Sequence, residues 1–260
     1  MKTETDYRHD IVEIGKRIYA KGFVAANDGN FSTRISDDEV IITPTGVSKG
    51  YLSPDQLIKV NISGEQLEGY LKPSSELSFH LKVYEIRPDV KAVVHAHPPF
   101  STAFAVAGIP LDDMILPESI VSLGCIPLAK YGTPGTDELV EAVAENISGC
   151  DAILLANHGA LTVGPDIYAA YYKMETMEHL AYIDWIARTI GRVNQLGEEE
   201  LRKLLELRKR FGDDKTFCDM CPVLSALQDD EKVPARTIAM NEQELTELIA
   251  QVTANVLKEL

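Results

Sequence analysis

Two short apolar segments that lead into histidine constrain the fold of this chain most strongly. Residues 93–97 read Val-Val-His-Ala-His, the pattern of a buried β-strand that ends in polar residues. Because alternate side chains of a strand share one face, His95 and His97 are expected to point the same way and to bind one ion. A second apolar strand, predicted over residues 152–156, leads to His158 and then to a glycine that lets the backbone turn. The sequence therefore predicts that two strands bring three imidazoles together.

These histidines predict a metal centre; the alternative is that they are solvated or packed in the core. Three neutral imidazole nitrogens suit zinc. Catalytic zinc sites generally have three protein ligands and one exchangeable position, whereas structural sites are closed by four ligands, commonly with thiolates. We therefore expect one Zn²⁺ per subunit, bound by His95, His97 and His158, and an enzyme rather than a structural zinc protein.

Small polar residues predict an anion site near this metal. Ser74 and Ser75 precede an apolar run over residues 77–86 that is typical of a mostly buried helix, so we expect them to form its N-cap. Unpaired N–H groups and the dipole at such a helix start favour an anion such as phosphate. Two tight turns, at residues 28–32 and 43–46, offer further small polar groups and close backbone approach. Each feature taken alone is also typical of an ordinary hairpin turn or a routine helix cap.

Length and composition predict one large catalytic domain, residues 1–233. With 260 residues and 45% apolar content, the chain can bury a substantial core without disulfides. The spacing of apolar residues predicts helices over residues 7–20, 77–86, 136–147, 167–190 and 198–211, and a loop-like segment over residues 217–233.

Five short motifs occur in a fixed order: G-N-x-S at 29–32, T-P-T-G at 43–46, P-S-S-E at 73–76, H-x-H-P at 95–98 and N-H-G at 157–159. Over roughly residues 8–215 the chain resembles the class II aldolase/adducin family, and within it the branch of L-fuculose-1-phosphate aldolases. The resemblance implies a single α/β domain with a mainly antiparallel central sheet between helical layers. It also implies a C4 homotetramer with zinc sites near the subunit interfaces.

The resemblance assigns roles to individual residues. It implies that His95, His97 and His158 are the zinc ligands and that Glu76 is the acid/base carboxylate. The residues that it implies for binding the substrate phosphate are Asn30, Thr45, Gly46, Ser74 and Ser75.

Two departures from this family pattern concern the proton donor. Fuculose-phosphate aldolases use a tyrosine shortly after the H-x-H helix, but no tyrosine occurs here between Tyr84 and Tyr131. The second family tyrosine, from the C-terminal segment of a neighbouring subunit, is also missing, because none follows Tyr182. Asp113 and Glu118 are the candidate substitutes, and for Glu118 a structural salt bridge is the alternative.

The resemblance implies an aldolase for a small phosphorylated sugar. It would cleave a ketose 1-phosphate of the L-fuculose or L-rhamnulose type to dihydroxyacetone phosphate and an aldehyde such as lactaldehyde. Alternatives on the same fold are a sugar-phosphate 4-epimerase and a methylthioribulose-1-phosphate dehydratase. A non-enzymatic, adducin-like interaction module is the alternative from another class of protein.

The end of the chain has a different pattern. After a linker at residues 234–240, residues 241–260 place apolar side chains at helical spacing on one face. This tail is similar to the encapsulation peptides that route enzymes into bacterial microcompartments, which implies shell or co-cargo partners. The alternative is a helix that packs on its own tetramer.

Several classes of partner are excluded by charge and hydropathy. A formal net charge of −15 without visible basic patches argues against nucleic acid. There is no signal peptide and no apolar run long enough to span a membrane, which argues against a membrane partner. Four cysteines fit a reducing compartment, so we expect a cytoplasmic protein, within a microcompartment if the tail targets it. Cys218 and Cys221 are expected to be ordinary loop thiols, with metal or redox chemistry as the alternative.

Overall fold

The computed structural model describes residues 2–210, 221, 223–224 and 227. Its centre is one sheet with the strand order β4-β3-β2-β1-β5-β8-β7-β6. Neighbouring strands are antiparallel except β6 and β7, which are parallel, so the predicted, mainly antiparallel sheet is confirmed. The strands are β1 (Asn30–Arg34), β2 (Glu39–Ile42), β3 (Ile58–Asn61), β4 (Gln66–Glu68), β5 (Ala92–Ala96), β6 (Leu128–Ala129), β7 (Ala152–Leu155) and β8 (Gly159–Gly164).

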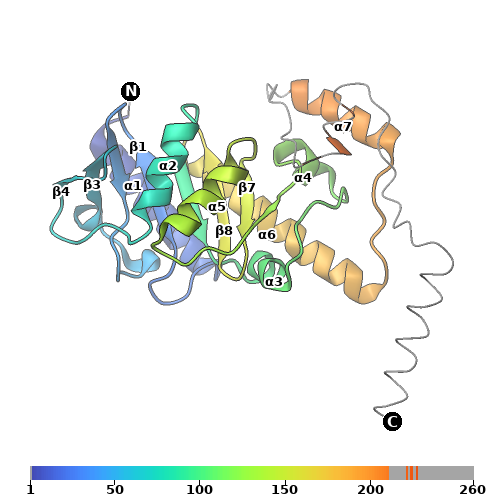
Figure 1. Ribbon diagram of the computed structural model, residues 1–260, viewed down its shortest axis with the longest axis horizontal. Coiled ribbons are helices and arrows are strands. Elements are labelled where there is room, and N and C mark those ends of the chain that lie inside the picture. The colour runs from blue at the N-terminus through green and yellow to red at the C-terminus, as the bar shows by residue number, and fades with distance from the viewer. Residues whose placement is uncertain (1, 211–220, 222, 225–226, 228–260) are drawn as a thin grey trace, which may run out of the picture.

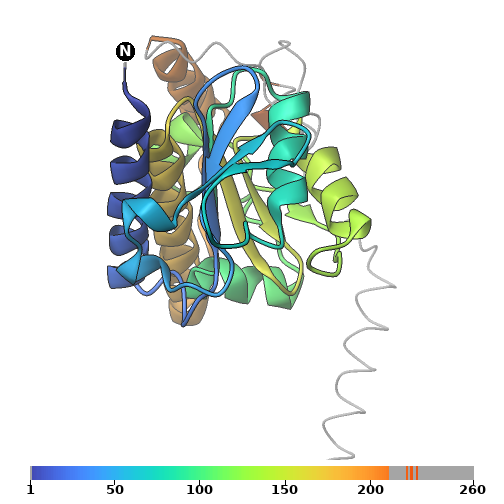
Figure 2. The ribbon, with the colours of Figure 1, turned by 90° about the vertical axis from the view of Figure 1, so that its left-hand side faces the viewer.

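Helices cover both faces of this sheet. Figure 2 shows α1 and α6 on one side and α2 and α5 on the other. In Figure 1, α4 and α7 lie together beyond the β7 side of the sheet. The α-helices are α1 (Glu4–Ala20), α2 (Leu77–Ile86), α3 (Pro99–Ala107), α4 (Pro117–Ser122), α5 (Asp137–Ile147), α6 (Ile167–Ile190) and α7 (Glu198–Arg210), and the 3₁₀ helices are η1 (Lys49–Tyr51) and η2 (Pro54–Gln56).

Successive side chains of the central strands point to opposite faces of the sheet, so the core has two layers. Val94 of β5 packs in a cluster with residues of α1 and α6, whereas Val93 packs in a second cluster with Phe79 of α2 and Val143 of α5. Because alternate side chains of a strand share a face, His95 lies on the Val93 side. The α2–α5 face of the sheet therefore carries the first predicted metal ligand.

The helices agree closely with the sequence pattern. The predicted helices over residues 77–86 and 167–190 are confirmed with the same bounds. Helix α1 begins at Glu4, earlier than predicted, because Thr3 and Asp6 form a capping box ahead of the apolar pattern. The linker 234–240 and the tail 241–260 lie outside the described residues. Within the described residues, no helix is both long and apolar enough to cross a bilayer.

A disulfide between Cys125 and Cys221 corrects the expectation of two ordinary thiols at positions 218 and 221. The two half-cystines are 96 residues apart in sequence. They belong to an apolar cluster that also contains Ile120 of α4 and Leu205 of α7, so the bond lies where these helices pack. Cys218 lies outside the described residues. With one pair of cysteines bonded, cysteine content no longer supports a reducing compartment.

Candidate metal and acid–base site

Three imidazoles meet at one end of the central strands. His95 lies in β5, His97 follows that strand, and His158 lies in the turn between β7 and β8. One ligand atom from each lies within 4.8 Å of the others. The Nε2 atoms of His95 and His97 are 3.2 Å apart. The convergence that the strand period predicted is present, and it is suited to a single ion.

Gly159 leaves the space that this convergence needs. A Cβ at this position would lie 2.5 Å from Cδ2 of His97 and 2.6 Å from the carbonyl oxygen of Ala96. Just before it, Asn157 has a φ of 55°, in the left-handed region that asparagine tolerates better than most residues. The N-H-G motif therefore both turns the chain and holds His158 beside the strand that carries the other two histidines.

The hydrogen bonds of the rings direct lone pairs into the shared space. Nδ1 of His95 donates to the carbonyl oxygen of Ala160 at 2.9 Å, which leaves Nε2 unprotonated in the neutral ring. Nδ1 of His97 lies 3.6 Å from Oδ2 of Asp28, which favours the same tautomer. Burial lowers the pKa of His95 and His97 and lowers that of His158 to about 4. All three rings are therefore neutral near pH 7, as metal binding requires.

Glu76 completes this group from the start of α2. Its side chain is buried, with Oε2 3.4 Å from Nε2 of His95 and Oε1 3.5 Å from Nε2 of His158. Burial raises the pKa of the Glu76 carboxyl. Glu76 is also the N-cap residue of α2, which corrects the prediction of a serine N-cap. The hydroxyl of Ser74 instead accepts a hydrogen bond from the backbone N–H of Glu76 at 3.3 Å.

The donor set fits a divalent metal. Nε2 of His95 and Nε2 of His97 lie 3.2 Å apart, close enough to serve as ligands of one ion. Oε1 of Glu76 and Nδ1 of His158 are buried without a hydrogen-bond partner, an arrangement that ordinarily costs free energy. Three neutral imidazoles beside one carboxylate match the ligand chemistry of zinc. The histidine triad is therefore positioned to bind a metal.

Polar residues that sequence reasoning missed surround Glu76. Nδ2 of Asn30 donates to Oε2 of Glu76 at 2.7 Å, and Oδ1 of Asn30 lies 2.6 Å from Nε2 of His80. Nδ1 of His80 lies 2.7 Å from the hydroxyl of Ser32, which is 2.7 Å from that of Tyr84. The only sequence signals were spacings: Asn30 and Ser32 alternate on β1, and His80 follows Glu76 by one helical turn. The Asn30 carboxamide, predicted to bind phosphate, contacts Glu76 and His80.

The fold brings two of the predicted phosphate segments side by side. The backbone N–H of Ser74 donates to the carbonyl oxygen of Thr43 at 3.2 Å, and the N–H of Thr45 donates to that of Lys72 at 3.1 Å. The T-P-T-G turn and the P-S-S-E segment are thus joined next to Glu76. Thr45, Gly46 and Ser75 are exposed there, whereas Ser74 is buried.

The model of the class II aldolase and adducin N-terminal domain matches residues 9–185 of the chain. This chain belongs to the class II aldolase and adducin family. A 3-oxo-tetronate 4-phosphate decarboxylase of Pectobacterium atrosepticum is 34% identical over 208 residues, which cover 78% of this chain and 91% of the relative. An L-fuculose phosphate aldolase of Methanococcus maripaludis is 35% identical over 184 residues, which cover 70% and 97%. The crystal structure of YgbL from Escherichia coli superposes with a TM-score of 0.73 at 32% identity, and the match covers 78% and 99% of the two chains.

The class II aldolase family and the intact site together identify this member as an enzyme of the lyase type. Its named relatives cleave carbon–carbon bonds as aldolases or decarboxylases. Three histidines that are positioned to bind a metal, with a carboxylate beside them, suit such chemistry. The fold, a single α/β domain with helices on both faces of a mixed sheet, is the class II aldolase fold.

The substitutes for the missing class II aldolase tyrosines lie apart from the histidines. Asp113 forms an ion pair with Arg188 of α6 at 2.6 Å and accepts a hydrogen bond from Gln195. Glu118 is exposed in the first turn of α4. Within the described chain neither carboxylate contacts Glu76 or a histidine of the triad. Their catalytic roles stay predictions.

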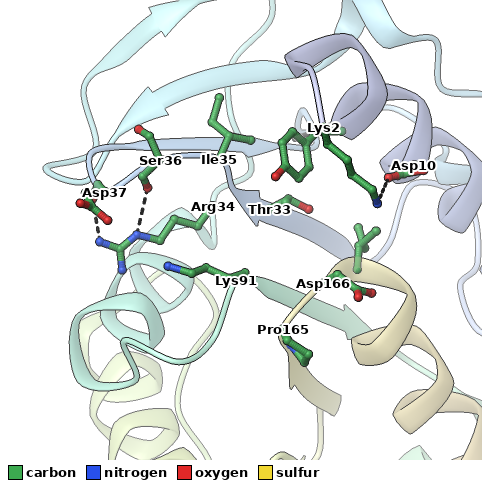
Figure 3. Close-up of a pocket in the computed structure, with 12 residues that line it drawn as sticks. Lys2, Asp10, Thr33, Arg34, Ile35, Ser36, Asp37, Lys91, Pro165 and Asp166 are labelled. Atoms are coloured by element: carbon green, nitrogen blue, oxygen red, sulfur yellow. Dashed lines mark hydrogen bonds and ion pairs between the residues drawn. The ribbon is translucent and has the colours of Figure 1, made fainter.

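A cavity lies at the opposite end of β1 from Asn30. It measures about 400 Å³ and is lined by residues that include Thr33, Arg34 and Lys91. Figure 3 shows Arg34 and Lys91 side by side, with the paired Lys2 and Asp10 across the cavity. Because Asn30 begins β1 and Arg34 ends it, the length of the strand separates this cavity from the histidine triad.

Proposed function

We propose that this enzyme is a zinc-dependent aldolase that cleaves a ketose 1-phosphate of the L-fuculose or L-rhamnulose type. The products would be dihydroxyacetone phosphate and an aldehyde such as lactaldehyde. The observation that supports this most directly is the meeting of three imidazoles with the buried carboxylate of Glu76, 3.5 Å from His158. The likeness to the fuculose phosphate aldolase of Methanococcus maripaludis supports the same reaction.

The residues of the site suit metal binding, phosphate binding and protonation of the enediolate in a retro-aldol cleavage. Zinc bound by the three histidines would act as a Lewis acid on the carbonyl and hydroxyl oxygens of the substrate. The exposed Thr45, Gly46 and Ser75 would bind the phosphate and orient the sugar. As a base takes the C4 hydroxyl proton, the C3–C4 bond would break, the aldehyde would leave and an enediolate would remain. Glu76 would then protonate C3 of the enediolate. Burial raises the pKa of the Glu76 carboxyl, which is the direction that suits a group that takes up and releases a proton during turnover.

Decarboxylation of a 3-oxo acid phosphate is the second candidate. The relative from Pectobacterium atrosepticum is named for it. Loss of CO₂ from 3-oxo-tetronate 4-phosphate leaves the same enediolate as the aldol cleavage, and protonation again yields dihydroxyacetone phosphate. This route needs no base for the C4 hydroxyl proton, and within the described chain Glu76 is the one carboxylate that contacts two histidines of the triad.

The second product separates these two reactions, because the first is shared. The zinc-loaded enzyme would be given L-fuculose, L-rhamnulose and 5-deoxypentulose 1-phosphates, and separately 3-oxo-tetronate 4-phosphate. We expect an aldehyde from at least one ketose phosphate. Release of CO₂ from the 3-oxo acid, with no aldehyde from any ketose phosphate, would replace the aldolase by the decarboxylase.

The remaining alternatives are tested with the same samples. A 4-epimerase would convert the ketose phosphate to its C4 epimer. A dehydratase would form a product that has lost one water molecule. An adducin-like interaction module would contain no zinc after purification in chelator-free buffer. We expect about one zinc per subunit, the stoichiometry of a single three-histidine site.

Substitution of Ser75 tests the phosphate site. Ser75→Ala is expected to weaken binding of the phosphorylated ketose more than binding of the free ketose, because a hydrogen bond to a charged phosphate is lost. The difference should be on the order of 1.5 to 3 kcal/mol, read from inhibition constants for the two ligands. Ser78→Ala is the matched control, since Ser78 is also exposed but lies on the first turn of α2. Equal losses for both ligands would show that Ser75 shapes the sugar pocket instead.

We further propose a homotetramer and a targeting role for residues 241–260. Deletion of this tail is expected to leave the oligomer, the zinc content and turnover in vitro unchanged, because the motifs of the site all precede residue 160. The same deletion should abolish association with microcompartment shell or co-cargo proteins, and Ile249→Asp should mimic it by placing a charge in the apolar face. Residues 234–260 fused to a fluorescent protein give the direct measurement in cells that produce a shell. Diffuse fluorescence combined with a tetramer lost on truncation would place the tail in the enzyme's own assembly.

A further inference from the structure

The buried hydrogen bonds beside Glu76 form a series in which each donor and acceptor follows from the bond before it, starting at the carboxyl group. The Asn30 group 2.7 Å from Oε2 of Glu76 is Nδ2, which donates to the carboxyl oxygen. The other end of the carboxamide is then the Oδ1 acceptor, and Nε2 of His80, 2.6 Å away, must donate to it. A neutral His80 therefore accepts at Nδ1, and the hydroxyl of Ser32 donates there. Tyr84 in turn donates to Ser32.

Every donor in this series points towards Glu76. The order is Tyr84 to Ser32, Ser32 to His80, His80 to Asn30, and Asn30 to Glu76. The side chains of Ser32, His80 and Tyr84 are at most 1% exposed, so water does not compete for these bonds. Polar side chains joined in such a series support one another, because each donor is strengthened by accepting a bond from the previous one.

We propose that His80 is a positioning residue for proton transfer, and that through Asn30 it holds Oε2 of Glu76 so that Oε1 is the oxygen that exchanges protons with the substrate. The proposal rests on the acid/base role of Glu76 in the proposed function. Oε1 carries no hydrogen bond among the described residues and lies 3.5 Å from Nε2 of His158, on the side of the metal ligands. The two oxygens of one carboxylate thus have different tasks.

The positions of these residues in the fold support a positioning role. His80 lies one turn after Glu76 on α2, whereas Asn30 and Ser32 lie on β1. His80 therefore contacts two residues of the strand from the helix, between the bonds that Glu76 and Tyr84 make to the same two residues. Burial lowers the pKa of His80 to about 3, so the ring stays neutral and keeps the tautomer that the series requires.

The test measures proton transfer without depending on the identity of the aldehyde. Zinc-loaded enzyme would be mixed with dihydroxyacetone phosphate in D₂O, and exchange of a hydroxymethyl proton followed by NMR. His80→Ala is expected to lower the maximal exchange rate by about tenfold to a hundredfold, the range for partners that orient a reacting group, with the half-saturating concentration nearly unchanged. His80→Gln should recover part of the rate, since its amide can donate to Asn30 from a similar position. The exposed His179 supplies the control variant His179→Ala.

Nitrogen NMR of the imidazoles gives a readout besides activity. In the zinc-loaded parent enzyme, the resonance that disappears in His80→Gln should show a neutral ring protonated at Nε2. A ring protonated at Nδ1 would overturn the proposed direction. Parent-like exchange in His80→Ala would overturn the positioning role alone, as would a change confined to half-saturation. A parent enzyme that exchanges no proton at all would overturn both this proposal and the proposed function.

Discussion

Replacing His95 with alanine is expected to remove bound zinc and to leave no turnover above background. The ring is fully buried, its Nδ1 is tied to Ala160, and its Nε2 faces both His97 and Glu76. His97→Ala and His158→Ala should behave in the same way, because a three-ligand site that loses one imidazole holds zinc weakly. Metal content per subunit and turnover would be measured on the same samples.

His179→Ala is the matched control for these variants, because His179 is an exposed histidine on α6. It should retain the zinc and the activity of the parent enzyme. Circular dichroism would establish that each triad variant is folded. A folded His95→Ala, His97→Ala or His158→Ala enzyme with full activity and no metal would remove that residue from the site.

Glu76→Gln is expected to keep zinc and fold while losing roughly a hundredfold or more in rate, the scale of a lost general acid/base. The glutamine carbonyl can still accept the hydrogen bond from Asn30, so the local structure need not change. Its amide cannot exchange a proton with the substrate as a carboxyl group does. Turnover and metal content together separate this outcome from loss of the site.

A carboxylate on the exposed face of the same helix provides the comparison. Glu85 lies on α2 in an exposed ion pair with Lys82, and Glu85→Gln should match the parent enzyme. The same measurement on Glu118→Gln tests the role predicted for that residue. Parent-like turnover in Glu76→Gln would end the acid/base assignment of Glu76.

The sequence predicted well those features that depend on the spacing of residues within one strand or one helix. The two-residue repeat of a strand placed His95 and His97 on one face, and the spacing of apolar residues gave the bounds of α6. The bounds of α2 were also predicted correctly, but its N-cap is Glu76 rather than a serine. Nothing local distinguishes Ser75 from Glu76 as the cap when the side chain of Glu76 is held by Asn30, 46 positions away in sequence.

The features that sequence missed all depend on register between distant segments. His80 contacts Asn30 and Ser32 only because β1 lies against α2 in one alignment, and a single sequence carries no record of that alignment. The partner of Cys221 lies 96 residues away, so spacing within the C-x-x-C motif held no information about it. Such contacts follow from the packed fold, whereas the ligand triad follows from strand period and turn chemistry.

The absence of a side chain at Gly159 is required both by the sheet and by the histidine triad. A methyl group there would meet both the ring of His97 and the backbone oxygen of Ala96, at 2.5 and 2.6 Å. The ring could swing aside, but the oxygen belongs to the β5 strand that pairs with β8. Any substitution at this position is therefore expected to disturb the histidine triad and the pairing of β5 with β8 together. Directed evolution of the site has to vary the surrounding loops and leave this residue fixed.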